Sequence, residues 1–246
     1  NAAAEDICNP WVGRFDMILL QTGSFKIAAM NAEPKLENLK NLTSANTLVD
    51  IDGAENKNIL PRFEAILNHT FDNNFSFAAG GGFQTFKFEY GTDTDSSINV
   101  NSYILGFELE GIFGPVTITG RGTYGSNLGL YLSGGIGGYN DRKPVFDLAT
   151  EKIRNNSSIS SFAGIKIKAT DAITPGAGYG FTTQIHDVKA YNDPDPAQYM
   201  FANCEFTIMD HLTIYPEVGY LYELQDHSGK DENSTIIIHS NVKVSF

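Results

Sequence analysis

Apolar and polar residues alternate along the last segment of the chain. From Ile236 to Phe246 every second residue is apolar, except for Ser240. The residues between them are polar from His239 to Ser245. A repeat of two residues places successive side chains on opposite faces of a strand. The pattern therefore predicts a β-strand with one apolar face and one polar face.

The same alternation recurs in about eleven segments, each near the roughly 9–11 residues that a tilted transmembrane strand needs. Tyr103, Leu105 and Phe107 share one parity, for example, while Glu108 and Glu110 share the other. The first and fourth segments are less regular, because apolar residues occupy both parities. The segments lie near residues 11–20, 23–32, 58–70, 74–88, 99–112, 115–124, 158–169, 172–184, 197–209, 211–223 and 234–246.

Short and long connections between these segments alternate strictly. The short ones are Gln21–Gly23, Phe71–Asn73, Phe113–Pro115, Thr170–Asp171 and Met209–His211. The long polar ones lie near 33–57, 89–98, 125–157, 185–196 and 224–233. Bacterial outer-membrane barrels have short periplasmic turns and longer extracellular loops. The sequence therefore predicts an all-β fold, a transmembrane antiparallel up-and-down β-barrel, with Phe246 at the periplasmic rim.

The number of segments is odd, which bears on how much of a barrel they form. A complete barrel of this kind has an even number of strands and a periplasmic N-terminus. We therefore expect residues 1–246 to form a single transmembrane domain that lacks N-terminal strands of a barrel of roughly 16–18 strands. Alternatively, the segment 128–139 hides a further strand, which gives about 11–12 strands in all.

The amino-acid composition agrees with a β protein, and the net charge restricts the classes of partner that the protein can bind. The chain has 24 Gly, 17 Phe and 11 Tyr, which favour strands over helices. Its net charge of -12 argues against nucleic-acid binding, because a phosphate backbone attracts a basic surface. The two cysteines, Cys8 and Cys204, form neither a disulfide framework nor a metal-binding pattern. We expect no metal and no cofactor, and we expect Cys204 to face lipid.

Several short phrases follow one another in order through the predicted strands. They are Leu60–Glu64, Gly82–Phe86, Phe113–Pro115, Asn127–Gly129, Ala177–Gly180 and Tyr215–Tyr220. They resemble the C-terminal half of porins from delta-proteobacteria, over roughly residues 58–246. The resemblance implies an outer-membrane channel for small polar solutes and a homotrimer in contact with membrane lipid and lipopolysaccharide. It fixes no functional residue.

The polar parities of the predicted strands collect charged residues of both signs, which are candidates to line a pore. The basic ones are Arg14, Lys26, Arg62, Arg121, Lys166, Lys168 and Lys243, and the acidic ones are Asp16, Glu64, Glu108, Glu110, Glu205 and Glu217. One interpretation is a transverse field that sets ion preference. The other is a wall of ordinary ion pairs that keeps the inner face hydrated. Under either interpretation, the set predicts a water-filled lumen.

The long loops carry most of the net negative charge. Asp93 with Asp95, and Asp193 with Asp195, are candidates for calcium binding, since hard cations take clustered carboxylates. The alternative, which the spacing favours, is a solvated acidic loop. The loop 125–157 begins with glycines and leucines, so we expect it either to fold into the lumen as a constriction or to pack over the barrel mouth or a neighbouring subunit.

Aromatic residues gather near the ends of the predicted strands, as in the interfacial girdles of membrane barrels. They are Trp11, Phe75, Phe113, Tyr179, Phe181, Tyr220, Tyr222 and Phe246. Catalytic motifs with a serine elbow, a zinc-binding helix or a phosphate loop do not occur. The run Gly80–Gly82 lies within a predicted strand, which indicates strand bending or close packing rather than a nucleotide site.

These patterns predict a porin of the bacterial outer membrane, not an enzyme, that passes small hydrophilic solutes and ions by passive diffusion. A non-conducting barrel that acts as a surface adhesin or structural protein is one alternative. A soluble β-sandwich that acts as a binding module is another. A lipase-like barrel that uses His239 in the lumen is a minor third possibility.

Overall fold

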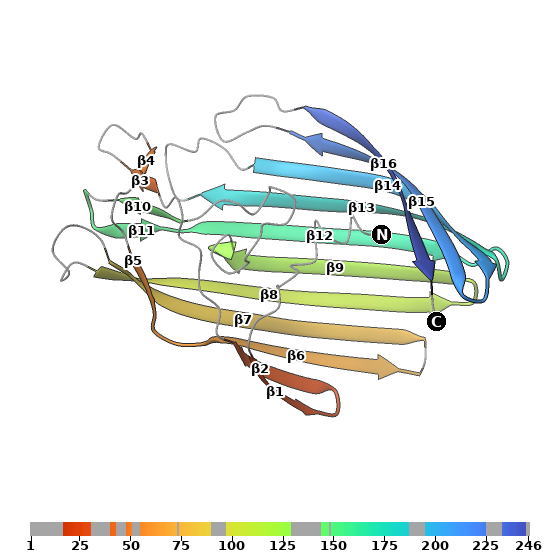
Figure 1. Cartoon of the computed structure of the whole chain (residues 1–246), viewed down its shortest axis with the longest axis horizontal. Coiled ribbons are helices and arrows are strands. Elements are labelled where there is room, and N and C mark those ends of the chain that lie inside the picture. Colours follow the sequence, from red (N-terminus) through yellow and green to blue (C-terminus); the bar gives the residue numbers. More distant parts are fainter. Residues whose placement is uncertain are drawn as a thin grey trace.

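The structure, a computed structural model, describes residues 17–30, 40–42, 48–50, 55–72, 74–89, 97–128, 144–147, 149–186, 195–224 and 233–244. One large antiparallel sheet dominates it (Figure 1). Its order is β1-β2-β6-β7-β8-β9-β12-β13-β14-β15-β16, so each strand lies beside the strand that precedes or follows it in this series. The connectivity is that of an up-and-down sheet, as predicted.

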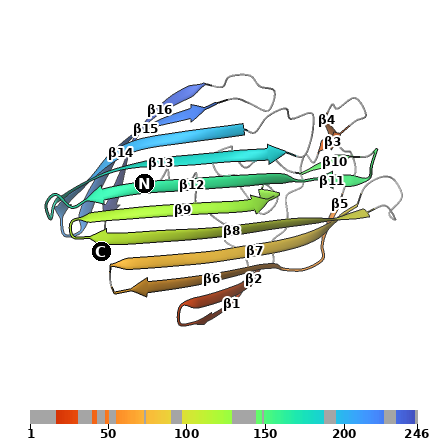
Figure 2. The ribbon, with the colours of Figure 1, turned by 180° about the vertical axis from the view of Figure 1, so that it is seen from behind.

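Each predicted strand has a counterpart in this sheet. The strands are β1 (Met17–Thr22), β2 (Phe25–Met30), β6 (Arg62–Phe71), β7 (Phe75–Glu89), β8 (Ser97–Phe113), β9 (Val116–Ser126), β12 (Asn156–Ile167), β13 (Ile173–His186), β14 (Asp195–Met209), β15 (Leu212–Glu223) and β16 (Ser234–Val244). The sheet curls round at β14, β15 and β16, and the short turns lie together at the right-hand end of Figure 1. Figure 2 shows the same strands side by side from behind.

The first hairpin differs from its predicted boundaries. Gln21 and Thr22 belong to β1, where they pair with Lys26 and Phe25 of β2. The turn is correspondingly tighter and follows at Gly23, which has a φ of 53°. Glycine adopts this left-handed conformation without steric cost, so it sets the position of the turn. The predicted boundary was wrong because apolar residues occupy both parities of this segment. The alternation that would mark the end of the strand is therefore absent.

Short strands occur where the sequence analysis placed only loops. They are β3 (Lys40–Leu42), β4 (Leu48–Asp50), β5 (Glu55–Asn58), β10 (Val145–Asp147) and β11 (Lys152–Arg154). Four of them form a small sheet in the order β11-β10-β3-β4, in which β10 and β3 run parallel. Strand β5 pairs with β7. The prediction of loops over 33–57 and 125–157 was wrong at these points, because three or four residues are too few to show a period.

Part of the predicted constriction loop is anchored on the large sheet. Phe146 of β10 is buried in a cluster with Phe86 and Phe88 of β7 and Val100 of β8. The ring centroids of Phe88 and Phe146 lie 5.5 Å apart. The segment 129–143, which includes most of the possible extra strand, lies outside the described residues.

The two faces of the large sheet differ in character. One of them, the apolar face, carries large hydrophobic side chains that are exposed, among them Phe63, Leu105, Phe107, Leu109, Ile118, Ile165, Met200, Val218 and Ile238. The other, the polar face, carries Lys26, Glu64, Glu108, Arg121, Lys166 and Glu217 at the alternate positions. Soluble proteins rarely expose an apolar area of this extent. A membrane barrel exposes it to lipid.

Other features of the apolar face agree with this assignment. Phe75 and Phe113 are exposed beside the short turns, and Tyr220 and Tyr222 are exposed nearer the other strand ends. Trp11 and Phe246 of the predicted girdles lie outside the described residues. Cys204 lies on the apolar face of β14, as Met200 does, which agrees with its predicted orientation toward lipid. Among the described residues no helix is long and apolar enough to cross a membrane.

The glycine run of β7 marks a close approach of backbones, as the sequence indicated. A Cβ atom at Gly80 would lie 2.8 Å from the carbonyl oxygen of Ala65 on β6 and 3.3 Å from Cγ1 of Ile66. Backbone cannot move aside as a flexible side chain can. Its partner across the β7–β8 pair, Gly106, has more room, with Thr123 Cγ2 at 3.4 Å from the corresponding Cβ.

Substitution of Gly80 by alanine is therefore expected to lower the free energy of unfolding by about 1–3 kcal/mol, because β6 and β7 must separate. Gly106→Ala serves as the control, because Gly106 lies directly opposite Gly80 on the same face of the sheet. This substitution should lower the free energy of unfolding by well under half as much. Urea titration in detergent micelles, followed by tryptophan fluorescence or circular dichroism, measures both. Equal effects of the two substitutions would contradict the steric explanation.

Candidate solute pathway on the polar face

Most of the charged residues predicted to line a pore lie on the polar face. They are Lys26, Arg62, Glu64, Glu108, Glu110, Arg121, Lys166, Glu205, Glu217 and Lys243. Lys168 instead lies just past the end of β12, and its Nζ is 2.7 Å from Oδ1 of Asp171 in the exposed turn. This contact lowers the pKa of the Asp171 carboxyl. Arg14 and Asp16 lie outside the described residues.

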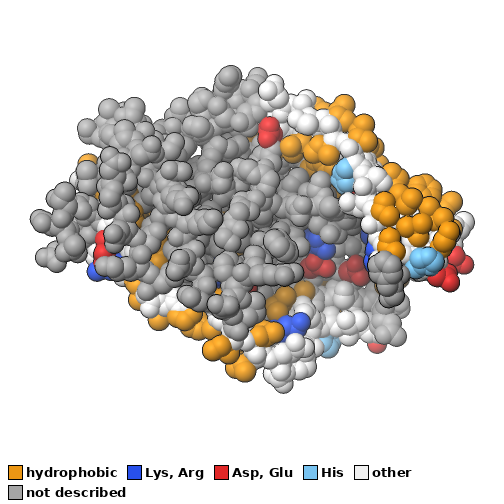
Figure 3. Space-filling view, viewed as in Figure 1, with side chains coloured by type: hydrophobic (Ala, Val, Ile, Leu, Met, Phe, Trp, Pro, Cys, Tyr) orange, Lys and Arg blue, Asp and Glu red, His pale blue; other side chains and the backbone are white. Residues whose placement is uncertain are grey.

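Opposite charges on this face form pairs across and along strands. Nε of Arg121 lies 2.6 Å from Oε2 of Glu108 on the neighbouring strand. Nε of Arg62 lies 3.4 Å from Oε1 of Glu64 on its own strand. Figure 3 shows acidic and basic side chains next to one another where this face is visible, with hydrophobic side chains toward the margins. The pairs give the wall both signs of charge without a large excess of either.

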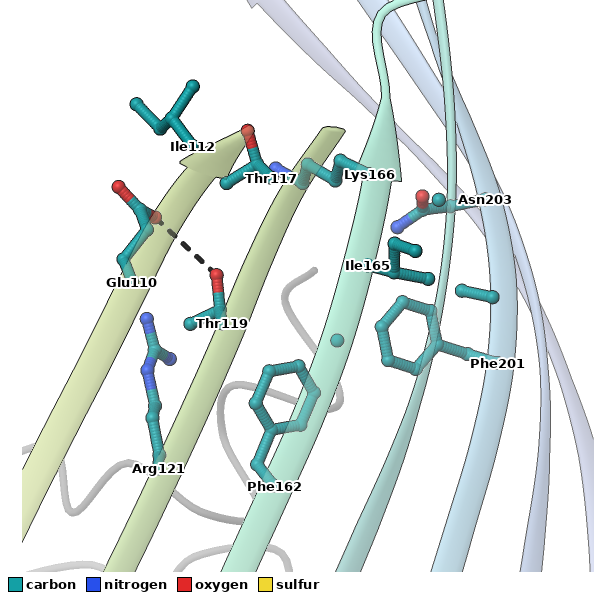
Figure 4. A pocket seen from close by; sticks show the side chains of 13 residues that line it. Glu110, Ile112, Thr117, Thr119, Arg121, Phe162, Ile165, Lys166, Phe201 and Asn203 are labelled. Carbon is teal, nitrogen blue, oxygen red and sulfur yellow. Dashed lines mark hydrogen bonds between the residues drawn. The ribbon is translucent and has the colours of Figure 1, made fainter. Parts of the chain in front are cut away.

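A cavity of about 310 Å³ opens on the polar face between β8 and β14. Figure 4 shows how its walls are divided. Glu110, Thr117, Thr119 and Arg121 come from β8 and β9, and Lys166 reaches toward Thr117 from β12. Phe162, Phe201 and Asn203 form the other side. The cavity thus has a charged, hydroxyl-rich wall and an aromatic wall.

The aromatic wall depends on a glycine between two strands. Phe162 of β12 and Phe201 of β14 are nearly parallel, with an interplanar angle of 7° and ring centroids 6.1 Å apart. Strand β13 runs between them and places Gly178 beside Phe201. A Cβ atom there would lie 2.6 Å from Cζ of Phe201. Because Gly178 has no side chain, the ring can lie over the backbone of β13.

A second cluster on this face, centred on Glu217, was not found from the sequence. Glu217 is 3 % exposed, and its Oε1 accepts a hydrogen bond of 3.1 Å from the hydroxyl of Tyr199. Its Oε2 accepts one of 3.1 Å from Nδ2 of Asn203. Nε2 of His239 lies 3.8 Å from Oε1. Gly219, which follows on the same strand face, leaves room for the ring of Tyr199.

The position of His239 agrees with its predicted orientation toward the polar face. Its neighbour there is Glu217, and the adjacent serine, Ser240, has the opposite parity on β16. In the part of the chain that the structure describes, no group of three or more His, Cys, Asp or Glu residues could hold a metal ion. Of the four candidates for calcium binding, Asp93, Asp95 and Asp193 lie outside the described residues, and Asp195 is the first residue of β14.

Comparison with known proteins identifies the fold. No protein-family model matches the chain, and no curated protein matches it. The structure superposes on the crystal structure of the outer-membrane channel DcaP of Acinetobacter baumannii with a TM-score of 0.66 and 13% identity. The alignment covers 94% of this chain and 61% of that channel. The chain has the fold of outer-membrane β-barrels. The chain spans less than two thirds of the length of DcaP.

Two further similarities are weaker. The trimer form of OmpT, an outer membrane protein of Vibrio cholerae, gives a TM-score of 0.45 at 12% identity, over 92% of this chain and 77% of OmpT. The NanC porin gives a TM-score of 0.42 at 11% identity, over 78% of this chain and 97% of that porin. The comparison with DcaP confirms the predicted all-β outer-membrane fold. The narrower resemblance to delta-proteobacterial porins stays a prediction.

Proposed function

We propose that this protein is a porin of the bacterial outer membrane that passes small hydrophilic solutes and ions by passive diffusion. The observation that carries the proposal is the division of one sheet into an exposed apolar face and a charged polar face. In a membrane barrel the apolar face contacts lipid and the polar face contacts water. In this proposal the charged residues of the polar face line the pore, and the protein carries out no catalysis.

The two edge strands of the large sheet indicate whether further strands complete a barrel. Among the described strands, β1 and β16 each have one neighbour in the sheet. An unpaired strand edge is not tolerated in the hydrocarbon region, because its N–H and C=O groups find no water there. We therefore expect both edges to pair with strands outside the described residues, in a closed barrel of roughly 16–18 strands. Contacts with membrane lipid and lipopolysaccharide and assembly as a homotrimer complete the proposal.

Planar-bilayer recording from the complete protein tests the channel. We expect stepwise increases of current that do not depend on voltage. Absence of such steps from protein whose β content is shown by circular dichroism would contradict the proposal.

Two neighbouring positions on β9 sharpen this test. Thr123 lies on the polar face and Tyr124 on the apolar face. Thr123→Trp is expected to lower the single-channel conductance, because the indole occupies the lumen. Tyr124→Trp should leave it unchanged, because that side chain faces lipid. The reverse order of effects would show that the two faces had been assigned wrongly.

A further inference from the structure

We propose that the cavity between β8 and β14 binds a compact zwitterionic solute, of the class of α-amino acids with an apolar side chain. The inference rests on the proposed function, since solutes must reach the polar face to enter the cavity. In this site, Glu110 binds the ammonium group of the solute and Lys166 binds its carboxylate. The aromatic wall contacts its side chain.

The first argument is that two opposite charges in the cavity are not neutralised by each other or by another residue that the structure describes. Within the described residues, the polar contact of Glu110 is with Oγ1 of Thr119, which donates a hydrogen bond of 3.4 Å to its Oε2. Lys166 has no carboxylate partner there. Elsewhere on the same face the carboxylates of Glu108 and Glu64 are paired with arginines. Glu110 and Lys166 thus differ from Glu108 and Glu64.

The second argument is the separation of these charges. Glu110 of β8 pairs in register with Thr119, and Lys166 of β12 pairs with Thr117. Strand β9 therefore lies between them, and the two pairings are two residues apart along it, so their backbones are roughly 12 Å apart on the diagonal. The long side chains of Glu110 and Lys166 reach into this gap, and it suits a molecule that carries an ammonium and a carboxylate on one carbon atom, with a hydrogen bond at each end. The two threonine hydroxyls supply further donors and acceptors along the gap.

The third argument comes from the volume of the cavity and from its aromatic wall. The cavity volume of about 310 Å³ is at the lower end of ligand sites, which run from roughly 300 to 1,000 Å³. Its space depends partly on Gly176, where a Cβ atom would lie 2.6 Å from Oδ1 of Asn203 and 3.3 Å from Cγ of Lys166. Phe162 and Phe201 present apolar surface beside this space. A small apolar side chain fits there.

Other solute classes match the cavity less well. A sugar stacks on a free aromatic face, but Cζ of Arg121 lies over the ring of Phe162, 5.8 Å from its centroid. A simple anion would be repelled by Glu110 and a simple cation by Lys166, at close range. A solute with both charges satisfies both side chains. The chemistry of the site therefore favours a zwitterion over a singly charged solute.

Current recordings with three matched solutes test the site. L-leucine carries both charges, isocaproate has the same skeleton without the ammonium group, and isopentylamine lacks the carboxylate. We expect leucine to interrupt the current of the complete protein at a concentration about tenfold lower than either singly charged solute, as one charged hydrogen bond predicts. Equal half-blocking concentrations for the three solutes would overturn the proposal.

Substitutions of the two charged residues test whether leucine blocks the current from this cavity. Glu110→Gln and Lys166→Gln should each raise the half-blocking concentration of leucine about tenfold. The double exchange Glu110→Lys with Lys166→Glu should restore much of the affinity, because a zwitterion can bind in the reverse orientation. Lys168→Gln, in the turn beyond β12, is the control and should have no effect. An unchanged leucine block in both single variants would also overturn the proposal.

The same recordings separate the two proposals. Protein that gives no conductance at all contradicts the porin function. A channel that conducts but does not prefer leucine contradicts only the zwitterion site.

Discussion

Replacement of Glu217 by leucine is expected to lower the free energy of unfolding by about 3 kcal/mol. Glu217 is buried, and its carboxylate accepts hydrogen bonds from Tyr199 and Asn203 on the neighbouring strand. Leucine would leave both donors without this acceptor and would remove the charge beside His239. Equilibrium unfolding by urea in detergent or in lipid vesicles measures the change.

A double-mutant cycle separates this network from simple loss of packing. Tyr199→Phe removes one donor and keeps the ring, so we expect it to cost about 1–2 kcal/mol. In the double variant Glu217→Leu with Tyr199→Phe, the combined loss should be smaller than the sum of the two by about 1 kcal/mol, because both remove the same hydrogen bond. Strictly additive losses would show that the hydrogen bond contributes no coupling.

Replacement of Leu109 by arginine is expected to lower the free energy of unfolding by roughly 2–4 kcal/mol. Leu109 is exposed on the apolar face, in the middle part of the span between Tyr103 and Phe113. A guanidinium group at that depth must enter hydrocarbon or draw water into it. The loss should shrink when the same variant is studied in short-chain detergent, where water reaches the site more easily.

Thr123→Arg is the matched control for this prediction. Thr123 lies on β9, which is the neighbour of β8, but on the polar face. An arginine there joins a wall that already holds charged side chains, so we expect a change within about 1 kcal/mol of zero. Similar losses for both variants in lipid vesicles would contradict the assignment of the apolar face to lipid.

The sequence predicted the strands and their faces because both depend on a repeat of two residues. The alternation of Tyr103, Leu105 and Phe107 with Glu108 and Glu110 holds in the structure, where the two sets lie on opposite faces. The positions of the tight turns were predictable as well, apart from the start of the first one, because residues such as Gly114, which has a φ of 60°, favour the left-handed conformation there. These features are local in the chain.

The contacts between strands were not predictable in the same way. The partnership of Glu217 with Tyr199 and Asn203 depends on the register of β14 against β15. That register shifts at an irregularity between Thr207 and Met209, before the turn. The sequence gives the parity of each residue but not this shift. For the same reason, the sequence could place Glu110 and Lys166 on one face but could not show that they share a cavity.

The small sheet joins parts of the chain that are far apart in sequence, which bears on the order in which the fold forms. Neighbours in the large sheet are mostly joined by short stretches of chain, so hairpins can form one after another with little loss of loop entropy. The parallel pair of β3 and β10 instead joins Asn41 to Phe146, from distant parts of the sequence. Phe146 also needs Phe86, Phe88 and Val100 in place on β7 and β8. We therefore expect the small sheet to form after this part of the large sheet during folding.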